Sequence, residues 1–248
     1  MICKTEAIVL HTTRYGENRL IVDTYTREHG RLSFIVTVGR GGRSSMKKQY
    51  FQPLTLLSVD ADLRPQQQLQ RLRGAELLSA RLSLLSEPDK LAIALFVAEF
   101  LYYALRGEQQ DSRLFDYVRS SLEWLDKRPD RYSNFHLVFL MHLSRFLGFY
   151  PNLTFHSSSP HPSNSLLYFD LRAAAFCATP PSHHDYLMPE EAGRIRPLMR
   201  MDFSTMHLFR LSRAERARLL EVIVRYYRIH LPAFPELRSL PVLHDLYG

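Results

Sequence analysis

Residues 5 to 48 read TEAIVLHTTRYGENRLIVDTYTREHGRLSFIVTVGRGGRSSMKK, and this stretch decides how the beginning of the chain folds. Within it, residues 31 to 38 alternate apolar and polar side chains, which is the period of a half-buried β-strand. The apolar members of that alternation are Leu32, Phe34, Val36 and Val38. Residues 5 to 11 and 19 to 26 are rich in β-branched and apolar residues. They predict two further strands, so the chain begins with β-structure.

Two more segments extend this β-rich region to about residue 80. Residues 51 to 60 favour a fourth strand, and residues 66 to 78 favour a fifth, although the composition of the latter also permits a helix. Five short strands followed by helical patterns predict a small closed barrel, and the OB-fold is the commonest barrel of this size. We therefore expect an α+β chain with an OB-fold barrel over residues 1–80 and a mainly helical domain over residues 81–248.

Positive charge is concentrated in the first of these domains. The chain has a net charge of +7, and residues 1 to 80 hold 12 Lys and Arg against 7 Asp and Glu. No acidic residue occurs between Glu28 and Asp60, an interval that includes the basic, glycine-rich segment GRGGRSSMKK. A surface charged so unevenly suits a polyanion such as nucleic acid. The alternative is a solvated loop whose charges only keep the protein soluble.

An OB-fold that binds single strands uses a cationic groove and aromatic rings on which bases stack. Tyr15 lies in a predicted turn and is the better candidate for stacking, whereas Phe34 belongs to the apolar face of its strand. For any single aromatic residue in this region, packing in the core remains the alternative. The candidate DNA-binding residues are Arg14, Tyr15, Arg19, Arg31, Arg40, Arg43, Lys47 and Lys48.

Helix signals dominate the rest of the chain. Pro88 and Gly107 would begin and end a helix that is apolar nearly all round, so we expect it to lie buried. Cap residues predict three more helices, over residues 111–127, 133–147 and 213–230, the last with a capping box. Residues 152–188 interrupt this pattern with an irregular stretch rich in Ser, Pro, His and Asn, which contains a possible hairpin at 166–177.

The order of several short motifs resembles the RecO family of bacterial recombination mediators. AIVL is followed by R-Y-G-E-N, by T-R-E-H-G-R-L and by a basic loop that ends at Ser44 or Ser45. Downstream, L-G-F-Y-P occupies residues 147–151, and R-Y-Y-R-I-H-L precedes L-R-S at residues 237–239. The resemblance covers most of the chain in order.

This resemblance implies an OB-fold followed by a helical domain, in agreement with the strand and helix patterns. It also implies binding of single- and double-stranded DNA without sequence specificity, and annealing of complementary strands. The partners that it implies are RecR, the C-terminal tail of single-strand-binding protein and, indirectly, RecA, which is loaded onto DNA coated by single-strand-binding protein. The expected location is the cytoplasm, in association with the nucleoid.

The chain departs from the resemblance in the irregular stretch. Many RecO proteins carry there a four-cysteine zinc module made of two C-x-x-C pairs, and this sequence retains only Cys177. Zinc is held by four nitrogen or sulfur ligands in a tetrahedron. The residues that could replace the missing cysteines are His156, His161, His183 and His184. A loop without metal is the simpler interpretation, so we expect no cofactor.

No catalytic motif was found in the sequence. The glycine-rich phosphate loops, the H-E-x-x-H metal motif and the G-x-S-x-G nucleophile motif do not occur, so we expect no enzyme. Two cysteines are too few for a disulfide framework. The N-terminus is not followed by an apolar signal segment, and no apolar run is long enough for a membrane span. We therefore expect a cytoplasmic protein.

Two alternatives to a DNA-binding mediator remain open. The chain could be a scaffold whose helical domain docks partner proteins, with incidental DNA affinity, or an OB-fold protein that binds RNA. An acidic, apolar tail would bind an apolar groove rimmed by arginine. The candidates for such a rim are Arg113, Arg119, Arg128, Arg131 and Arg145.

Overall fold

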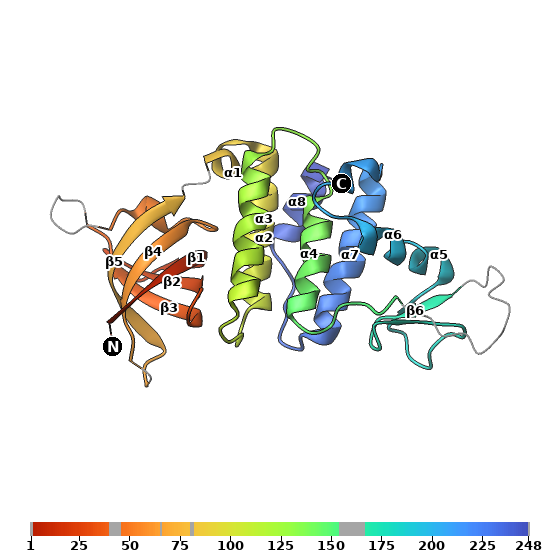
Figure 1. Cartoon of the computed structure of the whole chain (residues 1–248), viewed down its shortest axis with the longest axis horizontal. Helices are drawn as coiled ribbons and strands as arrows, with labels where there is room; N and C mark the ends of the chain where they lie inside the picture. Colours follow the sequence, from red (N-terminus) through yellow and green to blue (C-terminus); the bar gives the residue numbers. More distant parts are fainter. Residues whose placement is uncertain (1, 40–45, 65, 80–81, 154–166, 248) are drawn as a thin grey trace. The chain divides into compact units, whose positions relative to one another are not determined.

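The computed structural model describes residues 2–39, 46–64, 66–79, 82–153 and 167–247 (Figure 1). The chain forms two compact units. The first comprises Met1–Arg128 with Glu236–Leu246, and the second comprises Pro129–Pro235 with the last two residues. The expected domains, 1–80 and 81–248, stay a prediction. The compact units divide the chain differently, since residues 82–128 group with the barrel.

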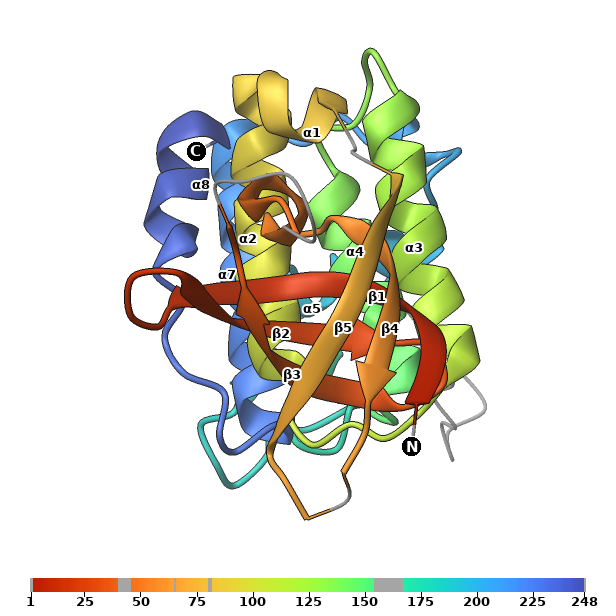
Figure 2. The same ribbon diagram turned by 90° about the vertical axis from the view of Figure 1, so that its left-hand side faces the viewer.

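Five strands close into a barrel in the first unit. They are β1 (Ile2–Arg14), β2 (Arg19–Thr26), β3 (Gly30–Thr37), β4 (Leu56–Asp62) and β5 (Leu69–Ser79). Strand β1 pairs antiparallel with both β2 and β4, and the order around the barrel is β1-β2-β3-β5-β4. Parallel pairing of β3 with β5 closes the barrel. In Figure 2, β5 runs obliquely across the near face of the barrel. The five-stranded OB-fold expected from the sequence is confirmed.

The barrel core follows the period-two pattern of the strands. Its buried residues are Ala7, Val9, Leu20, Val22, Phe34, Val36, Phe51, Leu57, Val59, Ala61 and Leu72. The predicted start of the fourth strand, at residue 51, is too early, since β4 begins at Leu56. Before it, Lys48–Phe51 forms a short 3-10 helix and Leu54 has a positive φ of 64°. Leu54 N donates to Val9 O at 2.7 Å, so this segment turns against β1 before β4 starts.

Three helices follow the barrel in the same unit: α1 (Leu82–Ser86), α2 (Pro88–Ala104) and α3 (Ser112–Lys127). Helix α2 is buried over most of its surface, as its apolar composition predicts, and Gly107 follows it with a φ of 79°. Asp111 caps α3, because its carboxylate accepts the backbone N–H groups of Arg113 and Leu114 at 2.8 and 3.1 Å.

The barrel packs closely on these helices at the β2–β3 turn. Gly30 has a φ of 63°, and a Cβ there would lie 2.7 Å from the backbone carbon of Gln109. Only glycine combines this conformation with so close an approach. Near it, Tyr25 is completely buried, and its hydroxyl donates to Gln109 O at 3.2 Å.

The end of the chain returns to the first unit as α8 (Ser239–Tyr247). The carboxylate of Glu99, on α2, accepts the backbone N–H groups of Arg238 and Ser239 at 2.9 and 2.8 Å. Glu99 therefore satisfies donors at the N-terminus of α8, which have no partner inside that helix.

The second unit contains α4 (Phe135–Phe146), α5 (Pro189–Ala192), α6 (Ile195–Arg200), a 3-10 turn (Met206–Leu208) and α7 (Arg213–His230). The expected helix at 133–147 begins at Phe135, after Asn134. Helix α7 spans the predicted residues, and its capping box joins Ser212 and Glu215. The expected hairpin is present as β6 (Tyr168–Asp170) and β7 (Ala175–Cys177), with β8 (Tyr186–Leu187) on the other side of β6.

No helix in the described ranges is long and apolar enough to span a membrane.

Candidate nucleic-acid interface

A hollow of about 850 Å³ lies on the barrel over β2, β3, β5 and the loop that precedes β5. Four of its lining residues are arginines and none is acidic, so the hollow is strongly positive and suits a polyanion. We call it the arginine groove. Its lining residues are Arg19, Ile35, Thr37, Gly39, Met46, Arg64, Gln67, Leu69, Arg71, Leu72 and Arg73.

The pleat of β5 supplies two of the four arginines. Gln70 and Leu72 are buried, whereas Arg71 and Arg73 are exposed. Because side chains alternate along a strand, the two arginines share the outer face. Sequence analysis missed both, and the signal that could have found them is the alternation in QRLR at residues 70–73.

The third arginine, Arg64, is positioned by a buried glutamine. Gln70 Oε1 accepts the backbone N–H of Arg64 at 2.7 Å, and Gln70 Nε2 donates to Arg64 O at 3.1 Å and to Gln67 O at 2.5 Å. A side-chain amide can make these bonds at once because it carries both an acceptor and two donors. Arg64 is thus held at the groove together with Gln67. Sequence analysis missed Arg64 as well.

The arginines of the groove differ in their partners. Within the described residues, no ion pair engages Arg19, Arg64 or Arg71, and all three are exposed. Arg73 Nη2 lies 3.0 Å from Asp62 Oδ2 on β4, and this hydrogen bond lowers the pKa of the Asp62 carboxyl. The groove therefore presents three arginines that form no ion pair in the described residues and a fourth that pairs with Asp62, whose charge also acts on Arg64 at longer range.

Three of the predicted DNA-binding residues lie together at the β1–β2 turn. Arg14 is exposed at the end of β1, and Tyr15 follows it in the turn with 49% of its surface exposed. The guanidinium carbon of Arg19 lies 5.3 Å from the centre of the Tyr15 ring, within cation–π range. Of the three, Arg19 lines the groove.

Arg31 lies elsewhere, and the structure corrects its inclusion in the candidate set. Its side chain is only 14% exposed, because its guanidinium binds Tyr102 O at 2.7 Å and lies 4.6 Å from the Tyr102 ring. Asp23 Oδ1 lies 3.6 Å from its second terminal nitrogen. Burial lowers the pKa of Arg31, and the nearby carboxylate opposes that shift. Arg31 therefore joins the barrel to α2 and is not available to a phosphate.

The basic loop is described only in part. Lys47 and Lys48 are exposed, and neither forms an ion pair with another residue of the described ranges. Gly39 and Met46, on either side of residues 40–45, both line the arginine groove. Arg40 and Arg43 lie outside the described residues and stay predictions.

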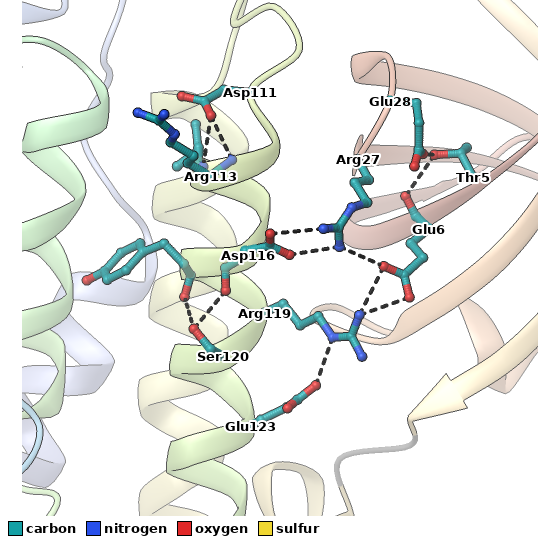
Figure 3. A network of polar contacts seen from close by, with 12 residues as sticks. Thr5, Glu6, Arg27, Glu28, Asp111, Arg113, Asp116, Arg119, Ser120 and Glu123 are labelled. Atoms are coloured by element: carbon teal, nitrogen blue, oxygen red, sulfur yellow. Dashed lines mark hydrogen bonds and ion pairs between the residues drawn. The ribbon is translucent and has the colours of Figure 1, made fainter.

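Two of the five predicted partner-binding arginines lie together on α3. Arg113 and Arg119 line a shallow hollow of about 500 Å³ with Asp116, Tyr117, Ser120 and Glu123. Arg113 is exposed, but Arg119 is held by carboxylates (Figure 3). Its guanidinium donates to both oxygens of Glu6, at 2.9 and 3.0 Å, and to Glu123 at 3.0 Å.

The other three lie apart. Arg128 follows α3 in the first unit, with its guanidinium 4.9 Å from the Trp124 ring. Arg131 and Arg145 belong to the second unit. Arg131 lines a hollow with His207, Leu208 and Arg210, whereas Arg145 lies 4.1 Å from the Tyr150 ring. A single arginine-rimmed groove made by all five is not observed within either unit, and their role stays a prediction.

Two of the three described candidates for zinc, His183 and Cys177, have other partners. His183 Nε2 lies 3.3 Å from Asp170, and Cys177 Sγ lies 3.9 Å from Tyr168 O, while burial raises the pKa of the Cys177 thiol. In the part of the chain that the structure describes, no three or more His, Cys, Asp or Glu residues gather as metal ligands would. His156 and His161 lie outside that part, so the expected lack of a cofactor stays a prediction.

The topology of the barrel and its cationic groove define the class of protein. It is an OB-fold protein in which a helical region follows the barrel. The family described as Recombination protein O N terminal matches residues 1–81, and Recombination protein O C terminal matches residues 85–241. The chain is 48% identical to DNA repair protein RecO of Bacteroides fragilis, 47% identical to that of Phocaeicola vulgatus and 35% identical to that of Porphyromonas gingivalis. Each alignment covers all of both chains. The chain therefore belongs to the RecO family.

Proposed function

We propose that the chain is a DNA repair and recombination mediator that binds single- and double-stranded DNA through the arginine groove. The observation that supports this most strongly is the set of three exposed arginines, Arg19, Arg64 and Arg71, without carboxylate partners in the described residues. Cations of this kind release counterions from the DNA backbone when they contact phosphates, and this release drives most non-specific binding.

Binding in this way does not depend on sequence. Phosphate contacts fix the position of a strand but carry no base information. Annealing then requires only that the charge of two strands be neutralised while they lie together, so no bond is made or broken and no catalytic residue is needed. In the cell the chain would act with RecR to load RecA onto DNA coated by single-strand-binding protein. It would work in the cytoplasm, at the nucleoid.

The test is single-strand binding across a salt series, with Arg19, Arg64 and Arg71 replaced together by alanine. Because each lost phosphate contact flattens the plot of log affinity against log salt by roughly 0.7, we expect a slope change of up to about 2. The matched control replaces Arg200, Arg210 and Arg213, three exposed arginines of the second unit, and removes the same charge. An unchanged slope in the groove variant, or an equal change in the control, would contradict the proposal.

The hollow on α3 is a second candidate site, for the tail of single-strand-binding protein, although Asp116 and Glu123 share it with the arginines. Arg113 is the exposed cation of that hollow. Titration of an acidic, apolar tail peptide against wild type and Arg113→Ala measures this contact. If the variant binds the peptide as tightly as wild type, the tail docks elsewhere.

Competition between DNA and RNA of the same sequence separates the proposed DNA-binding function from an RNA-binding function.

A further inference from the structure

The barrel has almost no aromatic surface. Residues 1 to 80 contain five Phe, Tyr or Trp residues: Tyr15, Tyr25, Phe34, Tyr50 and Phe51. Three of them, Tyr25, Phe34 and Phe51, are at most 2% exposed, and Tyr50 packs against the barrel core. Among these five residues Tyr15 alone is exposed, since Tyr50 is only partly accessible. The one exposed imidazole of the barrel strands, His11, lies against the Tyr102 ring of α2 at 4.7 Å and does not line the groove.

The arginine groove itself is aliphatic between its cations. The apolar residues that line it are Ile35, Met46, Leu69 and Leu72, and none of its lining residues is aromatic. OB-folds that bind single strands through their bases place successive bases on aromatic rings. A row of such rings cannot be built on this barrel.

The single exposed ring already has a partner. The guanidinium of Arg19 lies over Tyr15 with 5.3 Å between its central carbon and the ring centre. A base could stack on Tyr15 only on the face that Arg19 leaves open. At most one base could therefore stack on an aromatic ring beside the groove, while Arg19, Arg64 and Arg71 line the groove with positive charge.

We propose that the arginine groove binds the sugar–phosphate backbone alone. The bases of a bound strand then do not stack on protein side chains, and the edges with which they pair remain free. This inference rests on the proposed function and specifies what the groove holds. A strand presented in this way is ready to pair with a complementary strand, because no base must first leave an aromatic side chain. It also follows that the affinity for a single strand is the same whichever bases it carries.

The test compares an oligothymidine with a strand of equal length made of abasic tetrahydrofuran residues, both bound to the full-length protein. The two strands carry the same phosphates, so we expect dissociation constants within about threefold and equal salt slopes. Even one stacked base is worth about tenfold in affinity. An abasic strand that binds tenfold more weakly, or worse, would overturn the inference.

Two variants test which residues bind the strand. Tyr15→Ala should change the affinity for either strand by less than about threefold, and a tenfold loss confined to oligothymidine would overturn the inference. The triple alanine variant of Arg19, Arg64 and Arg71 should lose affinity for both strands equally. If it binds both as wild type does, the proposed function fails and this inference fails with it. If its slope flattens but the abasic strand binds weakly to wild type, only the inference fails.

Discussion

Two groups of arginines in the first unit have the same chemistry and different partners. Arg27 and Arg119 lie between the barrel and α3, where three carboxylates surround them (Figure 3). Arg27 contacts Glu6 at 3.2 Å and Asp116 at 2.8 Å. In the arginine groove, by contrast, Arg19, Arg64 and Arg71 have no such partner within the described residues.

This difference shows that the number of positive charges does not locate a binding surface. An arginine paired with carboxylates contributes to the contact between two elements, and a phosphate would have to displace its partner. An exposed arginine without a carboxylate offers its full charge to a polyanion. The partners of each cation, which depend on the fold, distinguish the two roles.

The largest effect is expected at the contact between the barrel and the helices. Gly30→Ala places a Cβ 2.7 Å from the backbone of Gln109 and forces an alanine into a left-handed conformation. We expect a loss of at least about 2 kcal/mol in the free energy of unfolding, measured with urea. Gly16→Ala is the matched control, because Gly16 has a φ of 75° but no atom within 4 Å of the added Cβ. If both variants lose the same free energy of unfolding, the close approach at Gly30 does not contribute to stability.

A smaller effect is expected from the carboxylate that joins the two paired arginines. Glu6→Gln removes the ion pairs to both Arg27 and Arg119, which are about one-third exposed. We expect a loss of about 1 kcal/mol in stability and no change in the salt slope of DNA binding. Glu123→Gln removes only the pair with Arg119 and should cost about 0.3–0.5 kcal/mol. A flatter salt slope in Glu6→Gln would mean that this face also contacts DNA.

The smallest effect is expected at Arg73, which lines the arginine groove but also pairs with a carboxylate. Asp62→Asn removes the charge that engages Arg73, so Arg73 becomes available to a phosphate. We expect tighter single-strand binding and a salt slope steeper by about 0.7. Asp60→Asn serves as the control, because Asp60 lies on the same strand and is exposed. Weaker binding in Asp62→Asn would show instead that Asp62 orients Arg73 for its ligand.

Much of the fold could be predicted because local rules decide it. The alternation in residues 31–38, the capping box at Ser212 and the glycine after α2 each predicted an element that the structure contains. The start of β4 was wrong because Leu54 adopts a positive φ, which a leucine does not signal. The grouping of the first three helices and α8 with the barrel depends on contacts between distant residues, such as Arg31 with Tyr102 and Glu99 with Ser239.

Prediction of the candidate site was less complete, for a physical reason. Sequence analysis found Arg19 but missed Arg64, Arg71 and Arg73, because attention to runs of like charge favours the loop at 40–48 over alternating charges in a strand. It included Arg31, whose partner Tyr102 is 71 residues away and invisible to any local pattern. Only the fold reveals which cations are already paired.

The most direct test compares Arg71→Ala with Arg119→Ala, which remove the same charge from the same unit. We measure the salt slope of single-strand binding and the free energy of unfolding for both. Arg71→Ala should flatten the slope by about 0.7 and leave stability within about 0.5 kcal/mol of wild type. Arg119→Ala should lower stability by about 1 kcal/mol and leave the slope unchanged. Equal flattening in both variants, or an unchanged slope in Arg71→Ala, would contradict the assignment of DNA to the arginine groove.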